Sequence, residues 1–411
     1  MEEQAPQKQP PSIWWYAFGY FAVYAPYTFL TKLIADGKLA NFLGEEHGVV
    51  SSIRPGCVGL EGCKPGIDGL AMLPLTGFVS MVGMFIFLSV MGWWKYAGHR
   101  KVLGLSLPCP SRWTFLSGLG SAVVIATTTL SYTFGISIVV MMLFMRGGML
   151  VMAPIVDLVN GRKPKTPAVI ATVLSILAIS AGAFLPILFP EESGAGGHGG
   201  EVKPQVMAAV ICVICYLAAY FLRMSFMSKK AKSDDPNATY RYFVEEQMTS
   251  TPALVLILGI FALIATIGGP DVGANNLQMV KAGFTLIFST ETAVVLGLMV
   301  LIGMFSQGNG IFGGLILLDK RDNTFCVPVN RASSVLAGVI STLCLWAFAG
   351  GKMLGMGEIV GALLLVGALC VLSAPSVIKK MKAKKAAQAS ATSAPTAASD
   401  SEPAPQKDTA A

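Results

Sequence analysis

Two arginines lie inside long apolar stretches of the 411-residue chain, where a permanent positive charge is unusual. Arg146 interrupts the run MLFMRGGMLVMAPIVD, and Arg331 interrupts the run VPVNRASSVLAGVIST. A guanidinium at the centre of a bilayer costs about 2.5–3.5 kcal/mol on insertion scales, so such a group usually faces a cavity or a partner. Two guanidinium groups in one cavity suit a carboxylate, a phosphate or a sulfonate, which each can bind through paired hydrogen bonds.

The alternative is that backbone carbonyls neutralise each arginine, which then only pins neighbouring helices. Neutral polar residues in the same or nearby apolar stretches are the candidates for further substrate contacts. They are Gln307 and Asn309 in FSQGNGIFGG, Thr128 and Tyr132 in TTTLSYT, and Asn330 beside Arg331. Each has a structural alternative, because hydroxyls in membrane helices often bond to their own backbone and spaced glycines also serve helix packing.

Few charged residues accompany these candidates. Glu245 and Glu246 open an expected helix at 242–267, where acids stabilise the helix dipole; they could instead balance the arginines or gate the inner mouth. Lys32 is either a vestibule charge or an interfacial anchor. Because no acid is expected in the middle of a helix, the sequence favours exchange of one anion for another over a proton relay.

Enzymatic chemistry finds little support. His47, His99 and His198 are far apart in sequence, and neither metal-ligand spacing nor a glycine-rich phosphate loop with lysine is present. We therefore expect no enzymatic activity, no metal and no cofactor.

The composition indicates an integral membrane protein. Hydrophobic residues make up 54% of the chain and charged residues 13%, about half the charged share of soluble domains. A membrane-spanning helix needs roughly 20 apolar residues. Ten stretches meet this requirement: 13–34, 70–94, 114–135, 137–159, 168–189, 206–227, 242–267, 291–317, 324–349 and 356–375.

Lysine and arginine placement predicts the orientation. With the N-terminus in the cytoplasm, 21 of the 30 basic residues fall on the inner side and seven on the outer side. Both termini are then cytoplasmic. The net charge of +7 is explained by basic loops facing anionic lipid, so no nucleic-acid partner is expected. A bacterial inner membrane is the preferred location, and a eukaryotic endomembrane is the alternative.

The segments divide the chain into parts. Residues 1–12 form a cytoplasmic leader, 13–189 a first set of five helices with a long outer loop at 35–69, and 190–205 an outer linker. Residues 206–376 form a second set of five, and 377–411 a tail expected to be disordered. In the outer loop, Cys57 and Cys63 either form a disulfide or remain free.

The fourth and ninth stretches resemble each other. MRGGMLVMAPIVD and NRASSVLAGVIST each have an arginine, then small residues, then an apolar run. Since five helices is an odd number, the second set would be inverted relative to the first, and Arg146 and Arg331 would occupy equivalent positions. Each would lie roughly 12–14 Å from its own membrane surface.

A ten-helix chain of two inverted five-helix halves resembles the drug/metabolite transporter superfamily. The stretch 127–184 is similar to its third-to-fifth helix pattern, and NTFCVPVNRASSVLAGVIST with GEIVGALLLVGALCVLS to its ninth and tenth. The element MLFMRGG is similar to the methionine–leucine–arginine–glycine element of the EamA-like, nucleotide-sugar-transporter-like branch. NGRK replaces the family's glycine–glutamate–arginine turn, and the first loop is unusually long.

The resemblance and the arginines together predict an all-α secondary transporter of a small anionic metabolite. Substrate would bind near the membrane midplane, and the two mouths would open alternately. One alternative is an exporter of neutral or amphipathic metabolites with structural arginines; another is a membrane scaffold or sensor. The expected partners are the small-molecule substrate and membrane lipid, with the chain as a monomer or a homodimer.

Overall fold

The computed structural model describes most of the chain between residues 13 and 392. The described ranges are 13–44, 52–53, 65–102, 105–134, 136–159, 166–188, 204–231, 235, 237–269, 274–286, 293–319 and 323–392. The expected N-terminal segment at 1–12, residues 190–203 of the expected linker at 190–205, and the cysteines Cys57 and Cys63 lie outside these ranges.

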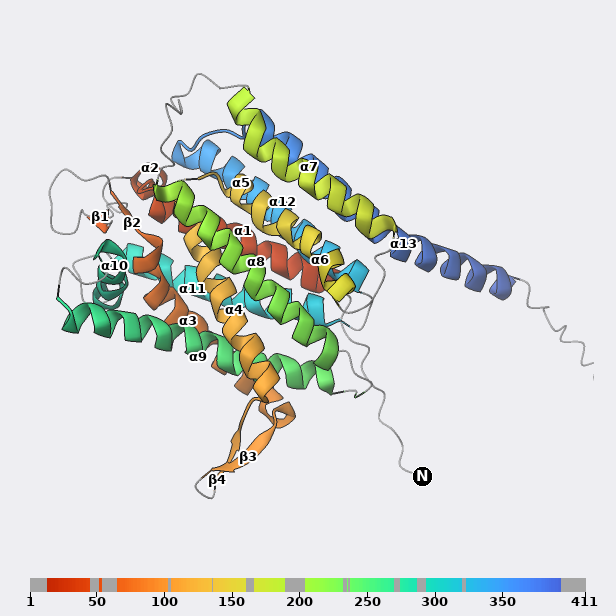
Figure 1. The fold of residues 1–411 in the computed structure, drawn as a ribbon, viewed down its shortest axis with the longest axis horizontal. Helices are drawn as coiled ribbons and strands as arrows, with labels where there is room; N and C mark the ends of the chain where they lie inside the picture. Colours follow the sequence, from red (N-terminus) through yellow and green to blue (C-terminus); the bar gives the residue numbers. More distant parts are fainter. Residues whose placement is uncertain are drawn as a thin grey trace, which may run out of the picture. The chain divides into compact units, whose positions relative to one another are not determined.

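Helices dominate the described residues, and each of the ten apolar stretches overlaps helical structure (Figure 1). The helices are α1 (Ile13–Ala35), α2 (Leu39–Leu43), α3 (Gly69–Val90), η1 (Trp93–Tyr96), α4 (Arg112–Ser131), α5 (Ile138–Met142), η2 (Leu143–Gly147), α6 (Gly148–Val159), α7 (Thr166–Leu188), α8 (Pro204–Lys230), α9 (Ala238–Ile267), α10 (Ala274–Thr285), α11 (Ala293–Leu318), α12 (Asn323–Ala349) and α13 (Met356–Thr392).

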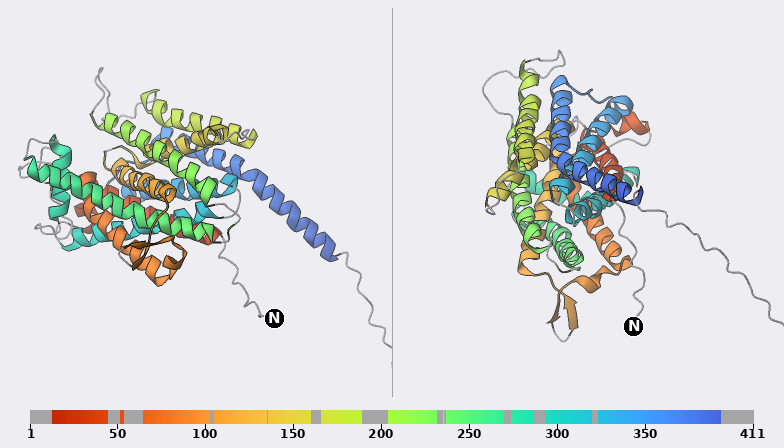
Figure 2. Two further views of the ribbon diagram at one scale, coloured as in Figure 1. Left: turned by 60° about the horizontal axis from the view of Figure 1, so that its bottom comes forward. Right: turned by 90° about the vertical axis from the view of Figure 1, so that its right-hand side faces the viewer.

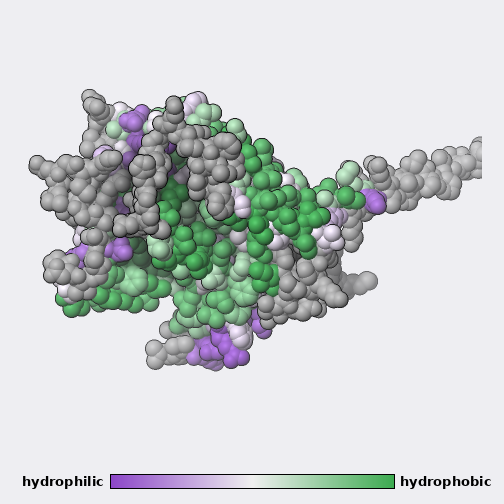
Figure 3. Space-filling model, turned by 45° about the horizontal axis from the view of Figure 1, so that its top comes forward, coloured by the Kyte–Doolittle hydropathy of each residue, from purple (hydrophilic) through white to green (hydrophobic). Residues whose placement is uncertain are grey.

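The long apolar helices are those of an all-α membrane protein. Seven helices in the described part of the chain are long and apolar enough to cross a membrane; they lie in α3, α4, α8, α9, α11, α12 and α13. Large apolar side chains on these helices, such as Ile214, Leu263 and Phe348, are exposed. Figure 3 shows hydrophobic residues over much of one face, as contact with lipid requires.

Two small strand pairs accompany the helices and were not expected from the sequence. β1 (Ser52–Ile53) pairs in parallel with β2 (Gly66–Ile67), and β3 (His99–Val102) forms an antiparallel hairpin with β4 (Leu105–Pro108). The second pair occupies the connection between α3 and α4. Its strands, HRKV and LSLP, have four residues each, which is too few to give a sequence signal of their own.

Three sets of helix contacts build the bundle (Figures 1 and 2). Helix α1 packs against α11 and α12, α4 packs against α8 and α9, and α3 packs against α9, α10 and α11. Glycines allow close approach at two of these crossings. A Cβ atom at Gly303 of α11 would lie 2.8 Å from the Thr76 carbonyl oxygen of α3. A Cβ atom at Gly118 of α4 would lie 3.0 Å from the Glu246 carbonyl oxygen of α9.

The last helix is longer than the sequence indicated. Helix α13 continues to Thr392, so it includes the first part of the stretch at 377–411 that was expected to be disordered. The sequence KKMKAKKAAQ is rich in alanine and lysine, which have high intrinsic helix propensity even without a packed face. The contacts within the chain divide it into two units, with the boundary between Ser373 and Ala374.

The close crossing of α3 and α11 leads to a prediction about stability. Gly303→Ala should destabilise the protein by about 1–3 kcal/mol, because backbone atoms of α3 leave no room for the methyl group. The matched control is Gly297→Ala in the same helix, where a Cβ atom meets nothing within 4 Å. Thermal unfolding in detergent should show a lower midpoint for Gly303→Ala alone. Equal midpoints for the two variants would contradict the crossing.

Candidate functional site

Arg146 lies in η2, a π-helical turn between α5 and α6. Such turns are rare and often occur at functional sites. Its side chain is buried, and its two terminal nitrogens donate hydrogen bonds to the hydroxyls of Tyr216 and Tyr24. The guanidinium carbon lies 5.4 Å from the ring centre of Tyr24 and 5.5 Å from that of Tyr216. Two tyrosines from different helices, α1 and α8, therefore hold this cation.

Arg331 of α12 is fully buried and reaches the same tyrosine. Its Nη1 donates to the Tyr216 hydroxyl at 3.4 Å, and its guanidinium carbon lies 4.7 Å from the ring centre of Tyr220. The structure thus brings together the two arginines that the sequence placed at equivalent positions. They meet at a single hydroxyl of α8.

Among the described residues, no acidic side chain neutralises the positive charge of these two arginines. The ion pairs in this part of the chain join Lys32 to Asp36, Arg223 to Glu246 and Arg241 to Glu245. Nε of Arg146, and Nε and Nη2 of Arg331, have no hydrogen-bond partner there. Like charges that share one hydrogen-bond acceptor in a region with little water repel each other. An anion bound near them would relieve this repulsion.

A cavity of about 90 Å³ opens beside Arg146. One water needs about 10–15 Å³, so the cavity has room for several waters or a small polar group. Tyrosines, small residues and neutral polar side chains line most of its wall. The lining residues are Tyr20, Tyr24, Tyr27, Ser121, Val124, Ile125, Thr128, Arg146, Tyr220, Arg223, Gln247, Ser250, Ser306, Asn309, Gly310, Gly313, Gly314, Leu317 and Asn330.

Three of the neutral candidates line this cavity. The Oδ1 atoms of Asn309 and Asn330 are buried and have no hydrogen-bond partner among the described residues. The Asn330 amide nitrogen donates to the Gly313 carbonyl at 3.3 Å. Thr128 also lines the cavity, but its hydroxyl donates to the Val124 carbonyl of its own helix at 2.7 Å. The two asparagines are therefore the better placed to contact a ligand.

The remaining candidates support the site from outside the cavity wall. Gln307 accepts a hydrogen bond from Ser80 at 3.2 Å and donates to the Met84 sulfur at 3.0 Å, which joins α11 to α3. The Tyr132 hydroxyl bonds to that of Tyr24 at 2.7 Å, so it positions a tyrosine that holds Arg146.

Lys32 lies near the end of α1. It donates to the Ile136 carbonyl at 3.1 Å and pairs with Asp36 at 3.3 Å. This arrangement joins α1 to the start of the α5 region, and Lys32 does not line the cavity described above.

Glu245 and Glu246 have different surroundings. Helix α9 begins at Ala238, so both acids lie inside it and the expectation that they open a helix is wrong. Glu245 accepts hydrogen bonds from the backbone of Gly98 and Ser111, from the Thr114 hydroxyl and from Arg241. It therefore fastens the ends of the β3–β4 hairpin to α9 instead of balancing the two arginines.

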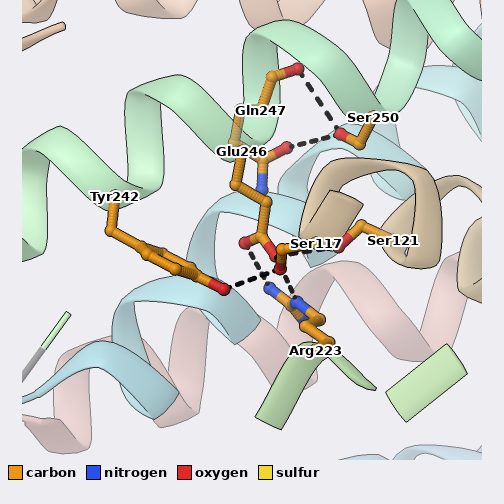
Figure 4. A network of polar contacts seen from close by, with 7 residues as sticks. All are labelled: Ser117, Ser121, Arg223, Tyr242, Glu246, Gln247 and Ser250. Atoms are coloured by element: carbon orange, nitrogen blue, oxygen red, sulfur yellow. Dashed lines mark hydrogen bonds and ion pairs between the residues drawn. The ribbon is translucent and has the colours of Figure 1, made fainter. Parts of the chain in front are cut away.

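Glu246 is fully buried and forms an ion pair with Arg223 (Figure 4). Its Oε1 accepts from Arg223 Nε at 2.8 Å, and its Oε2 accepts from Nη2 at 2.9 Å. The hydroxyls of Ser117 and Ser121 donate to Oε1 at 2.7 and 3.0 Å. A buried carboxylate in the helix interior is thus present, contrary to the sequence expectation that no acid lies mid-helix.

Arg223, Tyr24 and Tyr216 are not predicted as site residues by the sequence. Arg223 stands close to the basic run SKKAK, so its charge gives no signal separate from that of an inner loop. A signal for the tyrosines was available in two similar motifs, YFAVY at 20–24 and YLAAY at 216–220. Residues four apart lie on one helix face, and the rings within each pair are 5.2 and 4.8 Å apart.

Comparison with known proteins gives no family. No family model matches the chain, and no curated protein matches it. Sixteen chains of solved structures are similar in backbone. One, described only as "Crystal structure of protein", is 13% identical, with a TM-score of 0.45, over 87% of this chain and 98% of its own. A likeness this loose carries no argument about fold or function.

The shared hydroxyl of Tyr216 leads to a second stability prediction. Tyr216→Phe should lower the free energy of unfolding by about 1–3 kcal/mol, because two buried guanidinium groups lose an acceptor. Tyr27→Phe is the control, since it removes only a neutral bond to the Thr129 hydroxyl. The unfolding midpoint in detergent should fall further for Tyr216→Phe. An equal or smaller fall than for Tyr27→Phe would contradict the role given to Tyr216.

Proposed function

We propose that the protein is a secondary transporter that moves a small organic anion across a membrane by alternating access. The observation that carries this proposal is the buried excess of positive charge at Arg146 and Arg331. Burying an unpaired charge is costly, and such residues inside membrane segments usually mark substrate or ion pathways. A phosphorylated or carboxylated metabolite with two negative charges would balance the pair.

The helix contacts support two inverted repeats of five helices. In this correspondence α1, α3 and α4 are equivalent to α8, α9 and α11, and the α5–α6 region is equivalent to α12. Helix α1 packs against α11 as α8 packs against α4, and α3 packs against α11 as α9 packs against α4. The YFAVY and YLAAY motifs then fall on equivalent helices. This is the architecture expected from the resemblance to drug/metabolite transporters.

Substrate would bind at the interface of the two halves, as in other inverted-repeat transporters. Arg146 would bind the anionic group directly. Arg331, which donates to the Tyr216 hydroxyl and does not line the cavity, would attract the anion through its positive charge. Asn309 and Asn330 would supply neutral contacts. The proposed setting is a bacterial inner membrane with both termini in the cytoplasm, and the chain acting as a monomer or a homodimer.

One observation favours a second candidate, the transport of neutral metabolites with structural arginines. Arg331 does not line the cavity, and tyrosines and neutral amides make up much of its wall. Tyrosine hydroxyls and rings partly satisfy both guanidinium groups. In that case the arginines only hold neighbouring helices together, and the ligand needs no charge.

Thermal stability with and without anions separates the two candidates. A panel of phosphorylated and carboxylated metabolites that includes glycerol 3-phosphate and succinate should contain a compound that raises the midpoint of the wild type. A ligand at 100 times its Kd adds about 2.7 kcal/mol of stability. Arg146→Ala and Arg331→Ala should lose the shift, because each removes a positive charge from the site.

Arg241→Ala is the control, since Arg241 is exposed and pairs with Glu245 away from the cavity. It should keep the anion-induced shift. If no anion stabilises the wild type while Arg146→Ala or Arg331→Ala is already much less stable, the arginines are struts and the neutral-metabolite candidate replaces the first.

A further inference from the structure

The ion pair of Arg223 and Glu246 forms part of the same wall as the proposed anion site. Arg223 lines the cavity together with Arg146 and Tyr220, and Ser121, which donates to Glu246, lines it too. The ring of Tyr220 lies 5.8 Å from the guanidinium carbon of Arg223 and 4.7 Å from that of Arg331. The pair is therefore continuous with the two arginines and not a separate structural contact.

Arg223 is held on one edge only. Glu246 uses its Nε and Nη2 atoms, and the structure gives the third nitrogen, Nη1, no partner in the described part of the chain. A guanidinium can bind an oxyanion through two parallel bonds, and a second anion at the same guanidinium shares its single positive charge and is repelled by the first. An anion in the cavity would therefore compete with Glu246 for Arg223.

Losing Arg223 to a ligand would leave Glu246 as a buried carboxylate without a cation. Its side chain is fully buried, and only the hydroxyls of Ser117 and Ser121 would remain as partners. An uncompensated buried carboxylate is strongly disfavoured and takes up a proton instead. A serine hydroxyl can accept as well as donate, so the same serines can bind the protonated carboxyl.

We propose that Glu246 is the proton-binding site of the transporter, and that it takes up one proton when an anion enters the cavity. The anion bonds to Arg223, and a proton from water on the same side bonds to a Glu246 carboxylate oxygen. On release to the other side, the proton leaves for water and the ion pair re-forms. Proton and anion then cross together. The proposal rests on the transport function proposed above and gives it a coupling ion.

Few other titratable groups could take this proton. On α9 itself, the Tyr242 hydroxyl bonds to Ser117, 2.6 Å away, and Glu245 is turned to the β3–β4 hairpin. Helices α3 and α11, which also pack on α9, carry no titratable residue.

The remaining elements that pack on α9 offer cations and aromatic hydroxyls. On α8 these are Tyr216, Tyr220 and Arg223, with Lys229 and Lys230 at its end. On α4 the only titratable residue is Arg112, at its first position. Helix α10 contributes Lys281, and η1 contributes Lys95 and Tyr96. Glu246 is therefore the one buried carboxylate in the described residues that bonds to a cation of the cavity wall.

Titration calorimetry on the full-length protein in detergent tests this inference. Succinate and glycerol 3-phosphate are titrated in buffers of different ionisation enthalpy, which counts the protons taken up for each bound anion. We expect one proton per anion for the wild type. The Kd should rise about tenfold for each pH unit above pH 7, where both probes are dianions and protons become scarce.

Two neighbouring variants give a matched comparison. Glu246→Gln should bind the anion with no proton uptake and a Kd independent of pH, because the amide is already neutral. Glu245→Gln should keep one proton per anion, since Glu245 bonds to the hairpin and not to the cavity wall.

The outcomes separate this inference from the function on which it rests. Anion binding by the wild type without proton uptake overturns the proton site and leaves the anion site intact; this result needs no variant. One proton retained in Glu246→Gln overturns it as well, because another group then binds the proton. If neither probe binds the wild type, the dianion site and the proton coupling fail together.

Discussion

The uncancelled positive charge of Arg146 and Arg331 is the constraint on which the rest of the site depends. Both guanidinium groups are buried and donate to the same Tyr216 hydroxyl, so they repel each other in a region with little water. Holding them there requires elements from both halves of the sequence: α1, the π-helical turn η2, α8 and α12. The charge is dispersed over hydroxyls and aromatic rings, and no carboxylate in the described residues cancels it.

This choice of partners matters for function. A carboxylate would neutralise an arginine, as Glu246 does at Arg223, and an anionic ligand would then have to displace it. A tyrosine hydroxyl accepts a hydrogen bond but leaves most of the positive charge available. The ring face adds a weaker attraction, about 2 kcal/mol or more when the pair is desolvated. One cavity wall therefore contains two kinds of cation: Arg146, which is available, and Arg223, which is held by an acid.

The sequence predicted the apolar helices, because long apolar stretches are a strong signal. It also singled out Arg146 and Arg331, because a charge inside such a stretch is unusual, and the structure brings both to the Tyr216 hydroxyl. The sequence could not assign Arg223 and Glu246, since both depend on where a helix ends. Helix α8 continues to Lys230 and α9 begins at Ala238. Because these helices are a few residues longer than expected, Arg223 and Glu246 lie inside α8 and α9 and not at an expected loop or helix end. Sequence patterns are least reliable at such boundaries.

The tyrosines were missed for a different reason. A buried tyrosine is common in any apolar helix, so Tyr24 and Tyr216 gave no signal singly. Only their recurrence as YFAVY and YLAAY, on helices that the proposed repeat would make equivalent, distinguishes them. Gln307 and Tyr132 had the right chemistry, but the structure uses them to join helices and to position Tyr24. The rotation of a helix about its own axis decides which of its polar side chains faces a cavity. The spacing of residues along the sequence does not determine that rotation.

Counterflow in proteoliposomes tests the central claim most directly. Vesicles containing the full-length chain are loaded with unlabelled glycerol 3-phosphate or succinate, and the same radiolabelled anion is added outside. We expect uptake of label above the equilibrium level for at least one anion, lost in Arg146→Ala and kept in Arg241→Ala. Uptake no greater than in protein-free vesicles for both anions, or wild-type uptake by Arg146→Ala, would contradict the claim.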